Sequence, residues 1–136
     1  MQTLIYNVCM SKLLYPELSY QIVGALYKVH NALGSGYQEK YYCKAIALEL
    51  KRLNISFQEQ VLYNIHFNGQ PIGKYFADFV IENKVILEIK VGFRVILRDK
   101  KQLLGYLKES GLELGILAYF GTDKVTTERI TRGYNN

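Results

Sequence analysis

Three residues that could do chemistry together lie close in this chain: Asp78, Glu88 and Lys90. They fall in two apolar runs rich in β-branched residues, 77–81 and 85–91, which are separated by three polar residues. Such a pattern predicts two adjacent antiparallel strands joined in a hairpin. Because side chains alternate between the faces of a strand, Glu88 and Lys90 share one face. The apolar residues that alternate with them belong to the core.

The register of this hairpin determines how close the two acids come. If the turn is centred on Asn83, Ile81 pairs with Val85 and Asp78 lies opposite Glu88. Residues paired in this way have Cβ atoms roughly 4.5–5.5 Å apart. Directly opposed like charges are destabilising. The pair therefore needs a cation between the carboxylates or solvent on that face.

Two carboxylates suit a hard divalent cation such as Mg²⁺, which proteins hold by one or two carboxylates together with substrate phosphates. Such an ion can polarise a phosphoryl oxygen and activate water. Lys90, beside it, can orient the water or stabilise developing negative charge. The chemistry predicted is phosphodiester hydrolysis. An ordinary salt-bridged strand face, formed by Asp78, Glu88 and Lys90 in an interaction protein, is the simpler alternative.

The spacing of these residues also resembles a known signature. Asp78, followed ten positions later by Glu88-x-Lys90, resembles the active-site motif of the PD-(D/E)XK nuclease superfamily. Residues 30–39 (HNALGSGYQE) and 114–121 (LGILAYFG) resemble the small GxxExxR family within it. The resemblance covers roughly residues 10–130. It implies an α/β fold with a restriction-endonuclease-like αβββαβ core, in which a mixed sheet is flanked by helices.

The resemblance adds residues to the candidate site. It implies that Glu39 is a further metal ligand, that the backbone carbonyl of Ile89 is another, and that the ion is Mg²⁺ or Mn²⁺. In the exonuclease branch of the superfamily, a glutamine and a tyrosine like Gln102 and Tyr106 position the lysine or the substrate. Each has a simpler interpretation: Glu39 as a favourable charge in a helix's first turn, and Gln102 with Tyr106 as a polar helix face.

The chain also departs from the family pattern. Tyr42 occupies the position of the family's arginine and cannot make its bidentate contacts. Any such role would fall to Lys40 or Lys44, or be absent. Ala77 replaces the motif's proline, which removes no catalytic group. His30 could be a metal ligand or substrate contact, although a histidine on an apolar helix is more often a hydrogen-bonded structural residue.

The apolar patterning predicts the order helix, helix, three-stranded meander, helix, strand, strand. Asn68-Gly69 is a strong hairpin signal. Asp99 and Gly111 suit the N-cap and C-cap of the third helix. The predicted helices cover about 18–33, 37–53 and 99–111; the strands cover 55–67, the runs carrying Asp78 and Glu88, 114–120 and 125–130.

Length and composition favour a single globular domain. The chain has 136 residues, of which 49% are hydrophobic and 21% charged. We expect residues 1–9 to be an N-terminal extension and residues 10–136 to form the domain. No apolar run approaches the ~18 residues that span a bilayer, so we expect a soluble protein. Cys9 and Cys43 lack metal-ligand or disulfide spacing, which favours a reducing, cytoplasmic location.

The formal charge of +5 fits a polyanionic partner such as DNA or RNA. Five basic residues cluster within twelve positions, and only Asp99 opposes them. The cluster is either a solvated basic loop or a set of phosphate contacts, and we take Arg94 and Lys101 as candidate substrate contacts. Its members are Lys90, Arg94, Arg98, Lys100 and Lys101.

Together these features predict a metal-dependent nuclease-like domain that acts on nucleic acid. The alternative is an inactive module that keeps the fold and binds nucleic acid or a protein partner, which the tyrosine at position 42 favours. A domain this small has little surface for a long substrate, and a homodimer would provide more.

Overall fold

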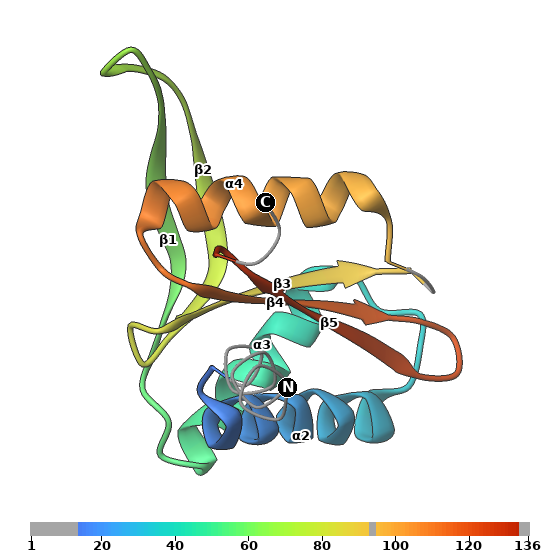
Figure 1. The fold of residues 1–136 in the computed structure, drawn as a ribbon. Coiled ribbons are helices and arrows are strands. Elements are labelled where there is room, and N and C mark those ends of the chain that lie inside the picture. The colour runs from blue at the N-terminus through green and yellow to red at the C-terminus, as the bar shows by residue number, and fades with distance from the viewer. Residues whose placement is uncertain (1–13, 93–94, 134–136) are drawn as a thin grey trace, which may run out of the picture.

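The computed structural model describes residues 14–92 and 95–133 (Figure 1). The expected extension, residues 1–9, and the candidate contact Arg94 lie outside the described residues. The chain forms, in order, α2 (Pro16–Leu33), α3 (Glu39–Arg52), β1 (Phe57–Phe67), β2 (Gln70–Ile81), β3 (Val85–Val91), α4 (Leu97–Ser110), β4 (Leu114–Phe120) and β5 (Val125–Thr131).

The described strands form one five-stranded sheet in the order β1-β2-β3-β4-β5. Neighbouring strands are antiparallel except for β3 and β4, which are parallel and connected through α4. Figure 1 shows α4 on one face of the sheet and α2 with α3 on the other. This is the mixed sheet between helices that the sequence predicts.

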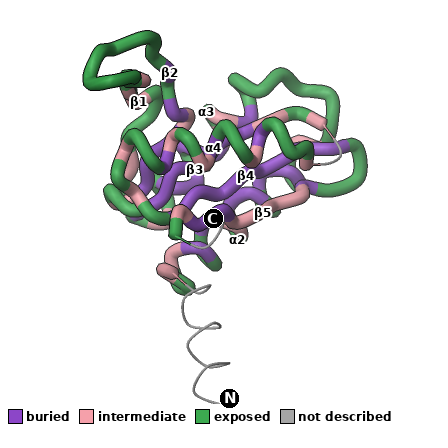
Figure 2. Tube along the Cα trace, turned by 45° about the horizontal axis from the view of Figure 1, so that its top comes forward, coloured by how far each residue is buried: buried purple, intermediate pink, exposed green. Residues whose placement is uncertain are grey.

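The core consists of two apolar clusters, one on each face of the sheet. One contains buried residues of α2 and α3 packed on the strands, and the other contains Leu103 and Leu107 of α4. We call these faces the α3 face and the α4 face. All seven residues of β4 are buried, as are the first five of β3 (Figure 2). A strand pattern of this kind is expected where helices cover both faces.

The hairpins have the predicted register. Asn68 and Gly69 both have positive φ, 50° and 76°, as a two-residue turn of this sequence requires. Between β2 and β3, Ile81 pairs with Val85, and two further pairs follow up to Phe79. The hairpin predicted to be centred on Asn83 is therefore present.

The beginning of α4 differs from the prediction. The helix begins at Leu97 with Ile96 as its N-cap, so Asp99 is not the cap. Asp99 is instead buried in the first turn, where it accepts a hydrogen bond from the Tyr119 hydroxyl. Gly111 ends the helix with φ 78°, as predicted. In the part of the chain that the structure describes, no helix is long and apolar enough to cross a membrane.

Candidate functional site

The strand that carries Asp78 changes face at this residue. Ala77 and Phe79 would share a face in a regular strand. Here Ala77 packs on the α4 face and Phe79 on the α3 face. On the neighbouring strand, Gln60 has φ 51°, and its side-chain amide donates a hydrogen bond to Asp78 Oδ1 at 3.4 Å. Asp78 therefore lies at an irregular point of the sheet, where the side chains of β2 change from one face to the other.

The Asp78 carboxylate also accepts a hydrogen bond from the backbone of β3. The regular pairing of β2 with β3 ends at Phe79 and Leu87, one step before Asp78 and Glu88. The Ile89 N–H donates to Asp78 Oδ2 at 2.8 Å. A side chain thus replaces a main-chain acceptor here. This bond fixes the Asp78 carboxylate against β3, beside Glu88.

Glu88 is buried, and its Oε1 has no hydrogen-bond partner among the described residues. Burial, followed by the charge of Asp78 and a hydrogen bond with it, raises the pKa of Glu88 to about 9, while Lys90 opposes this shift. Buried carboxylates are expected to behave in this way because a low dielectric disfavours the charged form. At neutral pH, and without a metal ion, Glu88 is protonated.

Glu39 approaches the same pair from the first turn of α3. Burial raises its pKa, Lys90 opposes this, and Asp78 adds to it. A hydrogen bond with the backbone of Val91 also stabilises the charged Glu39. Lys90 is half-buried and acts electrostatically on both glutamates. The fold therefore gathers Glu39, Asp78, Glu88 and Lys90, which we call the carboxylate cluster.

Two of the three carboxyl groups in the cluster, those of Asp78 and Glu88, lie side by side and could bind a metal ion. Within the described ranges, no group of three His, Cys, Asp or Glu side chains is arranged to hold one. The unpartnered Glu88 Oε1 beside the Asp78 carboxylate is nevertheless the kind of donor set that Mg²⁺ accepts, since this ion often binds one or two carboxylates and retains water. The residues present fit such an ion.

Tyr106 borders the cluster from the α4 side. Burial raises its pKa to about 12, and the charges of Glu88 and Asp78 contribute. The rings of Tyr75 and Tyr106 stack with centroids 3.5 Å apart, and the Tyr75 hydroxyl donates to the Tyr106 carbonyl at 3.1 Å. Gln102, one turn earlier on the same face, is exposed. The sequence gives no functional signal for Tyr75, which looks like a core residue.

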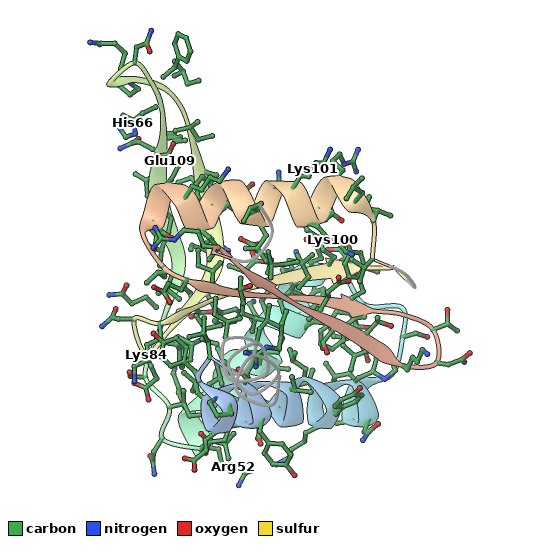
Figure 3. The ribbon with its side chains drawn as sticks, in the orientation of Figure 1. Arg52, His66, Lys84, Lys100, Lys101 and Glu109 are labelled. Atoms are coloured by element: carbon green, nitrogen blue, oxygen red, sulfur yellow. The ribbon has the colours of Figure 1, made fainter. Side chains whose placement is uncertain are left out.

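The predicted basic contacts lie elsewhere on α4. Lys101 is exposed on the side of α4 away from the sheet (Figure 3). It borders a cavity of about 310 Å³ between α4 and β5. Its neighbour Lys100 forms an ion pair with Glu128 at 2.6 Å. Lys101 thus lies on α4 at the edge of the cavity shared with β5. Among the described residues, no contact between Lys101 and the carboxylate cluster is seen.

Tyr42 and His30 both have structural roles. The fully buried Tyr42 donates a hydrogen bond to the Gly34 carbonyl at 2.7 Å, and its ring stacks on Phe120 with centroids 4.3 Å apart. The buried His30 Nε2 lies 2.8 Å from the Gly121 carbonyl. Because that oxygen only accepts, His30 donates. These bonds hold the loops at the ends of α2 and β4.

The sequence assigns no definite role to three residues near these sites, Lys40, Lys44 and Cys43. Lys40 and Lys44, which could have replaced the family's arginine, place their ammonium groups 5.1 and 6.0 Å from the centre of the Tyr41 ring. Cys43 is a half-buried free thiol. Burial, then the charges of Asp78 and Glu39, raises its pKa to about 12. Its closeness to the acids follows from the tertiary fold and has no local sequence signal.

Comparison with known proteins gives a family match. A family model described as the PD-(D/E)XK nuclease superfamily matches residues 16–132. A search of curated proteins finds no match. Among solved structures, a chain titled "Crystal structure of SSO0001" aligns with a TM-score of 0.49 and 18% sequence identity, over 84% of this chain and 76% of that chain. The family match includes every residue of the carboxylate cluster.

Proposed function

Because this chain belongs to the PD-(D/E)XK nuclease superfamily, we propose that it is a metal-dependent nuclease that hydrolyses phosphodiester bonds in nucleic acid. Its signature segments at 30–39 and 114–121 further favour the GxxExxR family. The main support from the geometry is the pair of Asp78 with the buried Glu88, whose Oε1 has no partner among the described residues, beside Lys90.

In this proposal Asp78 and Glu88 would hold Mg²⁺ or Mn²⁺, and the Ile89 carbonyl would be a further ligand. Glu39 would also be a ligand only if ion binding brought it closer, since the described residues form no group of three acids around one point. The hydrogen bond from the Ile89 N–H keeps the Asp78 carboxylate in place before an ion arrives. Glu88 must lose its proton to become a ligand. The chemistry that such an ion supplies is withdrawal of charge from a phosphodiester oxygen and acidification of water.

The remaining residues act on the water and the substrate. Lys90 orients the attacking water or stabilises the negative charge that develops on the phosphate. Tyr106 and Gln102 position the substrate from α4. The excess of positive charge favours a polyanionic partner, with Arg94 and Lys101 as outlying phosphate contacts.

Two measurements test the proposal. Isothermal titration with Mn²⁺ should show binding to the wild-type chain that is lost in Asp78→Asn and retained in Glu113→Gln, whose glutamate is exposed outside the cluster. Lys90→Ala should lower Mg²⁺-dependent cleavage at least about 100-fold while its circular dichroism stays that of the wild type. Lys108→Ala, an exposed lysine of α4, is the control. Wild-type cleavage by Lys90→Ala would refute the role given to Lys90.

A second function, binding of nucleic acid without cleavage, is favoured by one observation. Tyr42 is a buried structural residue at the position of the family's arginine. In that case the wild-type chain would bind neither Mn²⁺ nor Mg²⁺ and would leave DNA and RNA intact, while still binding them.

A further inference from the structure

An exposed group of tyrosines and lysines surrounds the first turns of α3. Tyr37 and Tyr41 are each 45% exposed, and their rings meet edge to face with centroids 6.3 Å apart. The ammonium groups of Lys40 and Lys44 lie over the Tyr41 ring. We call these four residues the tyrosine–lysine platform. It combines exposed aromatic rings with positive charge on one helix end.

The platform is anchored to the core through Tyr42. The rings of Tyr37 and Tyr42 meet edge to face with centroids 6.0 Å apart, and the Tyr37 N–H lies 3.4 Å from the Tyr42 hydroxyl oxygen. Tyr42 itself stacks on the buried Phe120. The tyrosine that stands in place of an arginine thus supports an exposed ring. A ring held in this way loses little conformational entropy when a ligand stacks on it.

A shallow cavity of about 540 Å³, open to solvent, lies between Tyr37 and Lys40 of the platform and Glu39 of the carboxylate cluster. Val91 forms part of its wall, is 49% exposed, and directly follows Lys90 in β3. Glu39, an acid of the cluster that interacts with Lys90, also lines it. A ligand bound here would therefore extend toward the proposed catalytic residues. The lining residues are Gly36, Tyr37, Gln38, Glu39, Lys40 and Val91.

We propose that the platform and this cavity bind an unpaired nucleotide of single-stranded DNA or RNA, an inference that rests on the proposed nuclease function. The exposed Tyr37 ring offers a stacking surface for a base, and the Tyr41 ring offers another when the ammonium groups of Lys40 and Lys44 turn from it to phosphates. Such stacking is sequence-tolerant because every base has a π-face. Lys40 and Lys44 attract the adjoining phosphates. In a duplex the bases are already stacked on one another and cannot use these rings. The substrate is therefore a single strand or an unpaired strand end.

Fluorescence anisotropy in EDTA tests binding without cleavage. The probes are fluorescein-labelled oligothymidylate and oligouridylate of about 12 nucleotides, and a blunt DNA duplex of the same length. Either single strand should bind the wild-type chain at least about tenfold more tightly than the duplex. Tyr41→Ala and Tyr37→Ala should each weaken this binding by roughly 5- to 150-fold, the range for loss of one base stack. Tyr41→Phe, which keeps the ring, should retain it.

Tyr20→Ala is the matched control. Tyr20 is 83% exposed and borders a cavity of about 520 Å³ on α2, whose other lining residues are Pro16, Glu17 and Gln21. That cavity has an aromatic ring but no lysine in its lining. Loss of the Tyr20 ring should therefore leave the affinity for the single strands unchanged. Equal binding of duplex and single strand, or an unchanged affinity in Tyr41→Ala, would overturn the proposal.

The lysines have a separate readout. Lys40→Gln and Lys44→Gln should each make the negative slope of log affinity against log salt shallower by about 0.7, as expected when one phosphate contact to a single strand is lost. An unchanged slope in both variants would contradict the phosphate role. If the chain neither binds metal nor cleaves, yet Tyr41 still determines binding of the single strand, only the nuclease function fails. If it cleaves while Tyr41→Ala binds normally, only this inference fails.

Discussion

At the scale of single residues, Glu88 shows how a buried acid pair is stabilised before any ion binds. The hairpin register alone requires a cation or solvent near two opposed carboxylates. Solvent does not reach Glu88 Oε1, and burial together with Asp78 raises the pKa of Glu88 to about 9. A proton therefore relieves the repulsion in the metal-free protein. The sequence cannot reveal this because it does not show how deeply Glu88 is buried.

This protonation makes the free energy of unfolding depend on pH. The ordinary pKa of Glu88, 4.5, applies to the unfolded chain, and about 9 to the folded one. Between these values the folded state binds more protons, so stability falls as pH rises and levels off above about 9. Glu88→Gln removes this loss, and we expect it to stabilise the metal-free protein at pH 7 by as much as about 3 kcal/mol.

Urea denaturation in EDTA at pH 5, 7 and 9 measures this prediction. The difference between Glu88→Gln and the wild type should be small at the lowest pH and increase toward the highest. Glu113→Gln, at an exposed position, should show no such trend. A Glu88→Gln protein that is less stable than the wild type at pH 9 would contradict the direction of the shift.

The sequence predicts the register of the hairpin, which the structure has as far as Phe79 and Leu87, but not the irregular backbone at Asp78. Strand alternation and the polar turn are local patterns, and they are enough to fix the register. The change of face at Asp78 lies beside Gln60, a non-glycine residue with positive φ that hydrogen-bonds to Asp78. Glutamine carries no signal for that conformation. The hydrogen bond from Ile89 to Asp78 follows from this irregularity and is visible only in three dimensions.

At the scale of elements, Glu49 connects the two helices of the α3 face. It accepts hydrogen bonds from Arg52 of the same helix at 2.9 and 2.8 Å, and Lys28 of α2 lies 3.1 Å away. The hydrogen bond with Arg52, despite burial, lowers the pKa of Glu49 to about 2. A lowered pKa stabilises the folded state above the ordinary value of 4.5.

We therefore expect Glu49→Gln to lower the melting temperature at pH 7. Because Glu49 contributes less as pH falls from 4.5 toward 2, the difference from the wild type should shrink over this range. Thermal unfolding followed by circular dichroism at pH 7 and pH 3 measures both values. Glu113→Gln, an exposed acid outside the helices, is the control. An equal difference at both pH values would show that the charge of Glu49 is not responsible.

The packing of α4 on β4 allows a matched pair of glycine substitutions. A Cβ at Gly115 would lie 2.7 Å from a side-chain carbon of the buried Leu103. Gly105, on the exposed side of α4, has nothing within 4 Å. Gly115→Ala should lower the free energy of unfolding by about 1–3 kcal/mol, and Gly105→Ala should raise it by up to about 1 kcal/mol. Urea denaturation measures the stability of both variants. A Gly115→Ala protein as stable as the wild type would contradict this packing.

The elements themselves could be predicted better than their contacts. Helical periodicity and Gly34 place the end of α2, and Gly111 places the end of α4. Asp99 looks like a helix cap in the sequence, yet the fold pairs it with Tyr119, twenty positions away. Leu48 fits the apolar pattern of α3 but is 68% exposed. Periodicity indicates that a residue is apolar, and only the packing of the helix decides whether it is covered.

At the scale of the whole molecule, stability is distributed unevenly. Helices cover β3 and β4 on both faces, whereas the β1–β2 hairpin extends past α4 (Figures 1 and 2). Near its tip, Phe67 and Ile72 are 64% and 66% exposed. His66 connects this part to the helix through two contacts with Glu109 of 3.3 Å, one from its backbone N–H (Figure 3). Both partners are partly exposed, so this connection is weak.

This distribution predicts the pattern of hydrogen exchange. Amides of residues 64–72 should exchange orders of magnitude faster than those of β3 and β4, because few buried contacts oppose local opening of the hairpin tip. Glu109→Ala should speed exchange at the tip and leave β3 and β4 unchanged, since it removes the oxygens that contact His66. Glu113→Ala, at an exposed position, should change neither. Mass spectrometry of exchanged peptides measures this, and equal protection of the tip and β4 would mean that an interaction absent from this structure covers the hairpin.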